Sequence, residues 1–170
     1  YHGPVGLKKI AEKIHSLAQN LEAQLTSLGI SQSNKFYFDT LHFSGFDIAA
    51  VQKEALAIDY NFRYFNDGKN DNSISITIDE TISAREIEKV VSLFERVTGK
   101  KASGKTAGGT SIPASLVRSS TYLQHPVFNT HHSETQMMRY IKQLENKDLS
   151  LNTSMISLGS CTMKLNAATE

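Results

Sequence analysis

Apolar residues recur every three or four positions over the first 28 residues, which is the spacing of one helix face. The repeat consists of Leu7, Ile10, Ile14, Leu17, Leu21, Leu25 and Leu28. Pro4 stands in a first-turn position that proline favours, and Gly29 follows the repeat, where glycine supplies a left-handed stop. The pattern predicts a long amphipathic helix.

Two shorter elements follow this helix. Residues 35–43, KFYFDTLHF, are rich in aromatic and β-branched side chains and predict a strand. In residues 46–58, FDIAAVQKEALAI, Asp47 is a favourable N-cap, and the apolar residues after it fall on one side of a helix. We therefore expect a second helix here.

The next segment alternates polar and apolar residues, which is typical of strands. Residues 60–65, YNFRYF, and 73–79, SISITID, flank the polar stretch NDGKND, in which Asp67-Gly68 is a turn signal. A β-hairpin is predicted. Ser83 and Glu86 then form an S-x-x-E capping box before a helix that ends at Gly99.

Residues 1–99 thus predict the order α-β-α-β-β-α, an α+β fold whose antiparallel sheet is covered by helices on one face. Residues 100–111 are Gly, Ser, Thr, Ala and Lys, the composition of a flexible linker. Residues 112–170 predict a mostly helical or irregular extension, in which Ser133 and Gln136 form a second capping box. We expect no internal repeat.

The stretch GKKASGKT, from Gly99 to Thr106, satisfies the G-x-x-x-x-G-K-[ST] pattern of a phosphate-binding loop. Such a loop must follow a buried strand and open a helix. Here a capped helix precedes the motif, and AGGTSIP follows it with two glycines and a proline. The context favours a flexible connector over a nucleotide site.

Composition narrows the classes of partner. Apolar residues make up 39% of the chain and the net charge is +1, so no global field attracts nucleic acid or an anionic membrane. No apolar run approaches the length of a membrane span, and no signal-peptide pattern opens the chain. Cys161 is the single cysteine, which excludes an intrachain disulfide and fits a reducing compartment.

Two short stretches could carry chemistry. In THHSE, His131, His132 and Glu134 invite a metal interpretation, but neighbouring histidines point in different directions, and the spacing favours capping of a helix with no metal. In LGSCTMK, Cys161 could be a nucleophile or a buried small residue. The small residues at this turn expose backbone N–H groups that suit a carboxylate or a phosphate.

Several stretches together resemble the glycine dehydrogenase (decarboxylating) family, the P-protein of the glycine cleavage system. They are YHGPVGLKKIAEKIH, FDTL, IDET, HPVFNTHHSETQMMRYIKQLENKDLSLN and SMISLGSCTMKLNAATE. The resemblance is to the middle of a much longer protein made of two related halves of the aminotransferase type I fold. It implies that residues 1–99 are the small C-terminal domain of the first half, and that residues 112–170 enter the catalytic second half.

The resemblance also implies an activity for the parent protein. It would use pyridoxal phosphate to decarboxylate glycine and would pass the aminomethyl group to the lipoyl arm of the H-protein. The family's Schiff-base lysine lies in an HK pair, which this chain lacks. We therefore expect no catalytic residue and no bound cofactor here, and an inactive fragment. The location implied is the cytoplasm for a bacterium and the mitochondrial matrix for a eukaryote.

Turn chemistry and the resemblance together suggest residues that line the parent's cofactor or glycine pocket. They are Ser160, Cys161, Thr162, Asn129, His131 and His132. A cut fragment should expose an apolar surface on the first helix or around residues 155–165, through which it can form a homodimer. The alternative is a free-standing α+β interaction module without catalysis.

Overall fold

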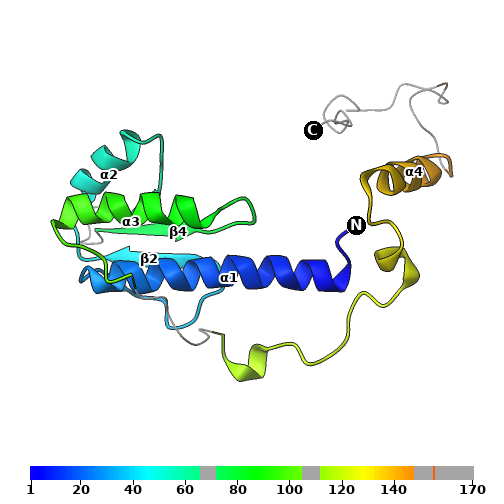
Figure 1. Ribbon diagram of the computed structural model, residues 1–170, viewed down its shortest axis with the longest axis horizontal. Coiled ribbons are helices and arrows are strands. Elements are labelled where there is room, and N and C mark those ends of the chain that lie inside the picture. Colours follow the sequence, from blue (N-terminus) through cyan, green and yellow to red (C-terminus); the bar gives the residue numbers. More distant parts are fainter. Residues whose placement is uncertain (66–71, 105–111, 148–154, 156–170) are drawn as a thin grey trace. The chain divides into compact units, whose positions relative to one another are not determined.

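The computed structural model describes residues 1–65, 72–104, 112–147 and 155. These residues belong to two compact units. One consists of Val5–Ser120, and the other of Tyr1–Pro4 together with the chain from Thr121 onward. The larger unit contains the helices α1 to α3 and the sheet, and the smaller contains α4 (Figure 1).

The first predicted helix is confirmed as α1 (Gly3–Ser27). Its second half is in the core, where its buried residues are Ile14, Ala18, Leu21 and Leu25. Near its start, Val5 and Leu7 keep 66% and 42% of their surface exposed. On α1, the expected exposed apolar surface is therefore present in the first turns and absent from the second half. Gly29, with a φ of 90°, follows the helix as predicted.

Four strands form one antiparallel sheet in the order β1-β2-β4-β3. The strands are β1 (Ser31–Gln32), β2 (Thr40–Ser44), β3 (Arg63–Phe65) and β4 (Ser73–Thr77). The hairpin of β3 and β4 is confirmed, with Tyr64 opposite Ile74. The expected turn at Asp67-Gly68 lies outside the described residues.

The strand predicted over residues 35–43 is shorter than expected and begins at Thr40. Tyr37 and Phe38, which precede it, are tied to α1 instead of to a neighbouring strand. His15 Nδ1 lies 2.7 Å from the carbonyl oxygen of Phe38, and the hydroxyl of Tyr37 donates to the carboxylate of Glu22. These contacts hold the segment away from a ladder. The two-residue strand β1 was not predicted, because no alternation can be recognised over two residues.

One face of the sheet is apolar and buried. Leu41 and Phe43 of β2 are paired with Ile76 and Ile74 of β4, and all four are at most 6% exposed. They form one cluster with buried residues of α1, α2 (Ile48–Leu56) and α3 (Ala84–Thr98). In Figure 1, α1 lies in front of β2 and α3 lies in front of β4, and all three helices contribute buried residues to the one cluster, so the prediction of helices on one face is confirmed.

The predicted caps are present. The carboxylate of Asp47 accepts from the N–H groups of Ala49 and Ala50, and Ser83 and Glu86 form the capping box of α3. Gly99 closes α3 with a φ of 69°. Further along the chain, Ser133 and Gln136 cap α4 (Glu134–Glu145) with the same kind of capping box.

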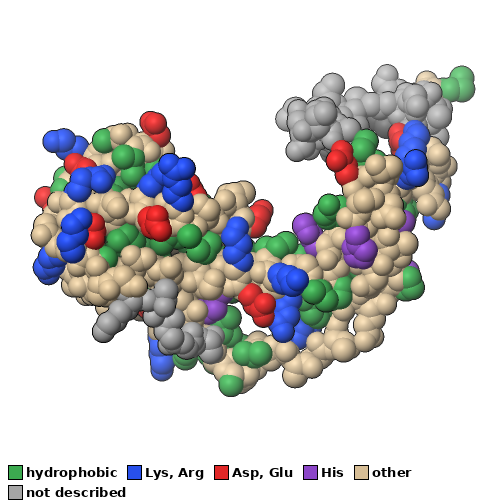
Figure 2. All heavy atoms as spheres, in the orientation of Figure 1, with side chains coloured by type: hydrophobic (Ala, Val, Ile, Leu, Met, Phe, Trp, Pro, Cys, Tyr) green, Lys and Arg blue, Asp and Glu red, His purple; other side chains and the backbone are tan. Residues whose placement is uncertain are grey.

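The larger unit carries charges of both signs on the face that Figure 2 shows, where basic and acidic side chains are interspersed.

The segment after Ile112 contains two short 3-10 helices, η1 (Ala114–Leu116) and η2 (Pro126–Asn129), and α4. None of these three elements has a buried residue. Apolar side chains are instead exposed on α4 and η2: Phe128, Met138, Ile141 and Leu144. Of residues 155–165, only Met155 is described, and it is fully exposed.

Candidate functional site

The beginning of the chain contacts a segment some 120 to 130 residues further on, within the smaller unit. The carbonyl oxygen of Tyr1 lies 2.6 Å from His132 Nδ1, and that of Pro4 accepts from the hydroxyl of Tyr122 at 2.7 Å. We call Tyr1, Gly3, Tyr122, Asn129 and His132 the N-terminal cluster. It contains two of the residues for which the sequence predicts a pocket role.

The hydrogen bond to Tyr1 fixes which nitrogen of His132 carries a proton. A carbonyl oxygen can only accept, so Nδ1 of His132 must be the donor. In the neutral ring Nε2 then carries the lone pair. The backbone N–H of His132 donates to Oε1 of Gln136 at 3.2 Å, so the capping box of α4 also holds this residue. His132 is thus an oriented side chain that presents an acceptor.

Gly3 allows the chain to approach the histidine closely. Its φ is +65°, a conformation that L side chains rarely adopt. A Cβ placed on Gly3 would lie 3.1 Å from the carbonyl oxygen of Phe128 and 3.3 Å from Cε1 of His132. A side chain at this position would therefore crowd the histidine as well as strain the backbone.

The other two described pocket residues are already engaged. Asn129 Nδ2 donates to the carbonyl oxygens of Leu123 and His125, at 3.0 and 3.3 Å. The ring of His131 is stacked on that of Tyr140, with centroids 4.2 Å apart. Asn129 therefore shapes the turn around η2, and His131 packs on α4. Of the three, His132 is the one with a ring nitrogen oriented as an acceptor.

The remaining predicted pocket residues, Ser160, Cys161 and Thr162, lie outside the described residues, so their roles stay predictions. Tyr1, Gly3 and Tyr122 were not singled out from the sequence. Nothing in their spacing indicates a contact with residues more than 100 positions away. Within the described ranges, no group of three or more His, Cys, Asp or Glu side chains could hold a metal ion.

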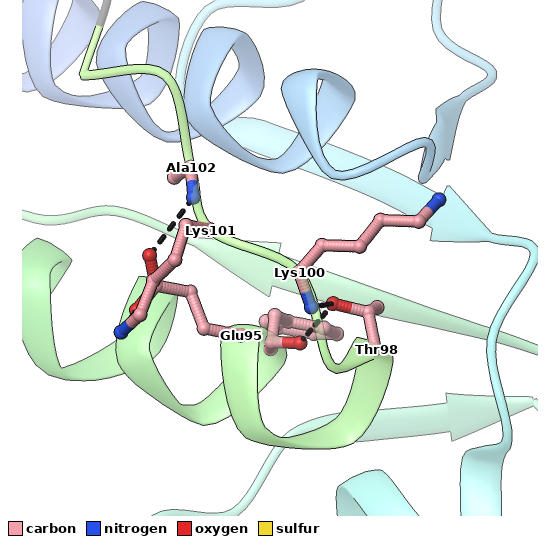
Figure 3. A network of polar contacts seen from close by, with 6 residues as sticks. Glu95, Thr98, Lys100, Lys101 and Ala102 are labelled. Carbon is pink, nitrogen blue, oxygen red and sulfur yellow. Dashed lines mark hydrogen bonds and ion pairs between the residues drawn. The ribbon is translucent and has the colours of Figure 1, made fainter.

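The described part of the phosphate-loop motif, residues 99–104, is held by protein groups. Glu95 accepts from Lys101 Nζ and from the backbone N–H of Ala102, both at 2.8 Å (Figure 3). These hydrogen bonds lower the pKa of Glu95, with the bond from Lys101 the larger cause. The N–H of Ser103 donates to Ser27 Oγ at 3.0 Å.

This arrangement is unsuited to a phosphate. A phosphate loop needs backbone N–H groups that point at the anion, whereas those of Ala102 and Ser103 already donate to protein oxygens. One of these acceptors, Glu95, is a carboxylate that would repel a phosphate. The helix α3 precedes the motif, as the sequence predicted. The second half of the motif lies outside the described residues, so the linker assignment for 100–111 stays a prediction.

We expect millimolar ATP to leave the melting temperature of this chain unchanged, because the N–H groups of Ala102 and Ser103, within the motif, already donate to protein oxygens. Differential scanning fluorimetry with ATP and Mg²⁺ measures this. A ligand present at 100 times its Kd would add about 2.7 kcal/mol of stability, so an upward shift at millimolar ATP would contradict our interpretation.

In the described part of the chain, no helix combines the length and the apolar character needed to cross a membrane.

The chain was compared with known proteins. Residues 1–94 match the family model described as "Glycine cleavage system P-protein". Over its whole length the chain is 49% identical to glycine dehydrogenase (decarboxylating) of Shewanella halifaxensis (strain HAW-EB4). It is 49% identical to the protein of the same name from Shewanella woodyi and 48% identical to that from Flavobacterium johnsoniae. The chain spans 18% of the length of each of these relatives.

The family model covers more than half of the chain, and the similarity to the relatives continues through the segment that contains Asn129 and His132. The stretches that resemble this family are thus part of one alignment over the entire chain. This chain belongs to the glycine cleavage system P-protein family.

Proposed function

We propose that this chain is an internal part of a pyridoxal-phosphate-dependent decarboxylase that acts on glycine and passes the aminomethyl group to the lipoyl H-protein. The observation that carries the proposal is 49% identity over the whole chain to a protein named glycine dehydrogenase (decarboxylating). An identity this high over an entire chain is typical of shared chemistry as well as a shared fold. The bacterial source of the relatives supports a cytoplasmic parent enzyme.

Residues 1–99, which form most of the larger unit, would serve as the small domain of an aminotransferase-type half. Its α+β architecture, with three helices on the apolar face of an antiparallel sheet, supports this assignment. The segment from Ile112 onward would then lead into the second half of the parent enzyme. In this assignment the sheet is a scaffold, and the reacting groups come from other parts of the polypeptide.

The described residues do not by themselves fit pyridoxal phosphate. A site for this cofactor needs a lysine for the aldehyde and groups that hold the phosphate. The recorded contacts of Asn129, His131 and His132 are with backbone carbonyls, Gln136 and Tyr140, and they bring no lysine or arginine to the cluster. When bound in the parent enzyme, the cofactor supplies an electron sink. The chain alone is therefore proposed to be inactive.

His132 would line the pocket as an oriented acceptor. Its Nδ1 is occupied by the Tyr1 carbonyl, so Nε2 is available to accept a hydrogen bond from a protonated group. Thr162, in the turn predicted at GSCT, would contribute a hydroxyl and a backbone N–H toward a carboxylate. Neither residue is proposed to form a covalent bond.

In the complete enzyme, His132→Ala and Thr162→Ala should each lower kcat/KM for glycine by roughly 2- to 10-fold. This range follows from the net value of one hydrogen bond, about 0.5–1.5 kcal/mol. Steady-state decarboxylation assays measure it. His42→Ala is the matched control, because His42 is half-buried on the sheet against Phe65, outside the predicted pocket residues, and should leave the kinetics unchanged. Unchanged kinetics in both pocket variants would contradict the assignment.

A further inference from the structure

The edge of the sheet has a notch, because β4 extends beyond the residue that is paired with the first residue of β3. Arg63 is the first residue of β3 and is paired with Ser75, whereas β4 continues to Thr77. On its other side β4 is paired with β2 along its full length, up to Thr77 opposite Thr40. The segment before β3 lies beside the notch but is not paired with β4, and the N–H of Tyr60 in this segment donates to the carbonyl of Ala55 at 2.9 Å.

The backbone of Thr77 faces this notch. The N–H of Ile78 donates to the carbonyl of Asp39 at 3.0 Å, in the direction of β2. Neighbouring residues of an antiparallel strand direct their N–H and C=O groups to opposite sides. Those of Thr77 therefore point away from β2. Among the described residues, no backbone hydrogen bond to Thr77 is found on that side.

A cavity of about 370 Å³ lies at the notch. Its walls come from the segment before β3, from β4, from the turn after β4 and from α3. The apolar residues in these walls are Tyr60, Phe62, Ile76, Ile78, Ile82, Ile87 and Val90. The charged groups at its rim are engaged elsewhere, since Arg63 lies over the ring of Phe65 and Glu86 belongs to the capping box of α3. The cavity thus combines largely apolar walls with one unpaired peptide group, that of Thr77.

An extended peptide matches this combination. Its own N–H and C=O can pair with those of Thr77 as an added strand, and one of its aliphatic side chains can fill the cavity. An unpaired strand edge is a ready template for such pairing. A small polar ligand would leave the apolar walls of the cavity without a contact.

The length of the relatives indicates where such a peptide comes from. This chain spans 18% of their length, so about four fifths of the polypeptide lies outside residues 1–170. We propose that the notch receives an extended segment of the parent polypeptide from outside residues 1–170, paired with Thr77 and inserting an aliphatic side chain between β4 and α3. The inference requires a longer parent chain and does not depend on its reaction.

Amide hydrogen exchange at single-residue resolution tests the proposal, by mass spectrometry with electron-transfer fragmentation. In residues 1–170 alone at low concentration, the Thr77 amide should exchange close to its intrinsic rate. In the complete polypeptide it should exchange at least about 100-fold more slowly. The Ile78 amide, bonded to Asp39 in this chain, is the internal control and should be protected in both proteins.

A variant localises the effect. Ile82→Glu places a carboxylate in the cavity, and in the complete polypeptide it should return the Thr77 amide to fast exchange while Ile78 stays protected. Leu56→Glu, at a position that is 59% exposed, should change neither amide. Equal Thr77 exchange in the two wild-type proteins would overturn the proposal. Protection in residues 1–170 that grows with concentration would also overturn it, because the occupant would then be a second copy.

Discussion

Phe94→Ala is expected to lower the free energy of unfolding of the larger unit by about 3–5 kcal/mol, the usual cost of removing a buried phenylalanine side chain. Phe94 is 0% exposed, and its ring lies 5.4 Å from that of Phe46 and 6.4 Å from that of Phe62. The ring joins α3 to the segments on either side of α2. Its loss leaves a cavity that the sheet and three helices cannot collapse to fill.

Urea denaturation followed by far-ultraviolet circular dichroism measures this change, because the chain has no tryptophan to report by fluorescence. The control is Phe36→Ala. Phe36 is 54% exposed and contacts Lys35 Nζ 5.3 Å from its ring centre, so its removal should cost less than about 1 kcal/mol. Should Phe94→Ala fail to fold, Phe94→Leu gives a smaller loss of the same sign. Equal costs at positions 94 and 36 would contradict the assigned core.

Gly3→Ala is expected to release His132 from Tyr1. An L residue with a left-handed backbone costs about 1–2 kcal/mol, and the added Cβ would also lie 3.3 Å from Cε1 of His132. A cost of this size lowers, by roughly 5- to 30-fold, the population of molecules in which His132 is hydrogen-bonded to Tyr1. The His132 ring should then lose its preference for the Nδ1-protonated tautomer.

Long-range ¹⁵N–¹H correlation spectra of the histidine rings measure the tautomer, with His132→Gln used to assign the signal. Gly104→Ala is the matched control. Gly104 has the same φ of +65° as Gly3, but nothing lies within 4 Å of its Cβ position. It should leave the His132 spectrum unchanged. If both variants shift the tautomer equally, the contact at Gly3 does not orient the histidine.

The hydrophobic pattern predicted most of the larger unit because each element carries its own local signal. Each signal can be recognised from neighbouring positions in the sequence. Examples are the apolar repeat of α1, the alternation in β4 and the capping box at Ser83. The missed features depend on distant partners. Tyr37 and Phe38 do not pair as a strand, because they are hydrogen-bonded to Glu22 and His15 of α1. The spacing of apolar residues does not indicate such contacts.

The candidate site could be predicted only in part, for the same reason. THHSE indicated a cap and a histidine near a pocket, and the structure confirms the cap at Ser133. The tautomer of His132 could not be foreseen, because it is set by a carbonyl 131 positions away. The phosphate-loop pattern is local and matches by spacing alone, whereas its meaning depends on whether its N–H groups are free to bind an anion.

The bond from Lys100 Nζ to the carbonyl of Leu28, 3.0 Å long, has a consequence for the order of folding. The last turn of α1 has no basic residue of its own to offset the negative end of the helix dipole. The lysine that does so is 72 positions away, in the segment that follows α3. We therefore expect the end of α1 to be completed late in folding, and α1 and α3 to lose structure together when the unit unfolds.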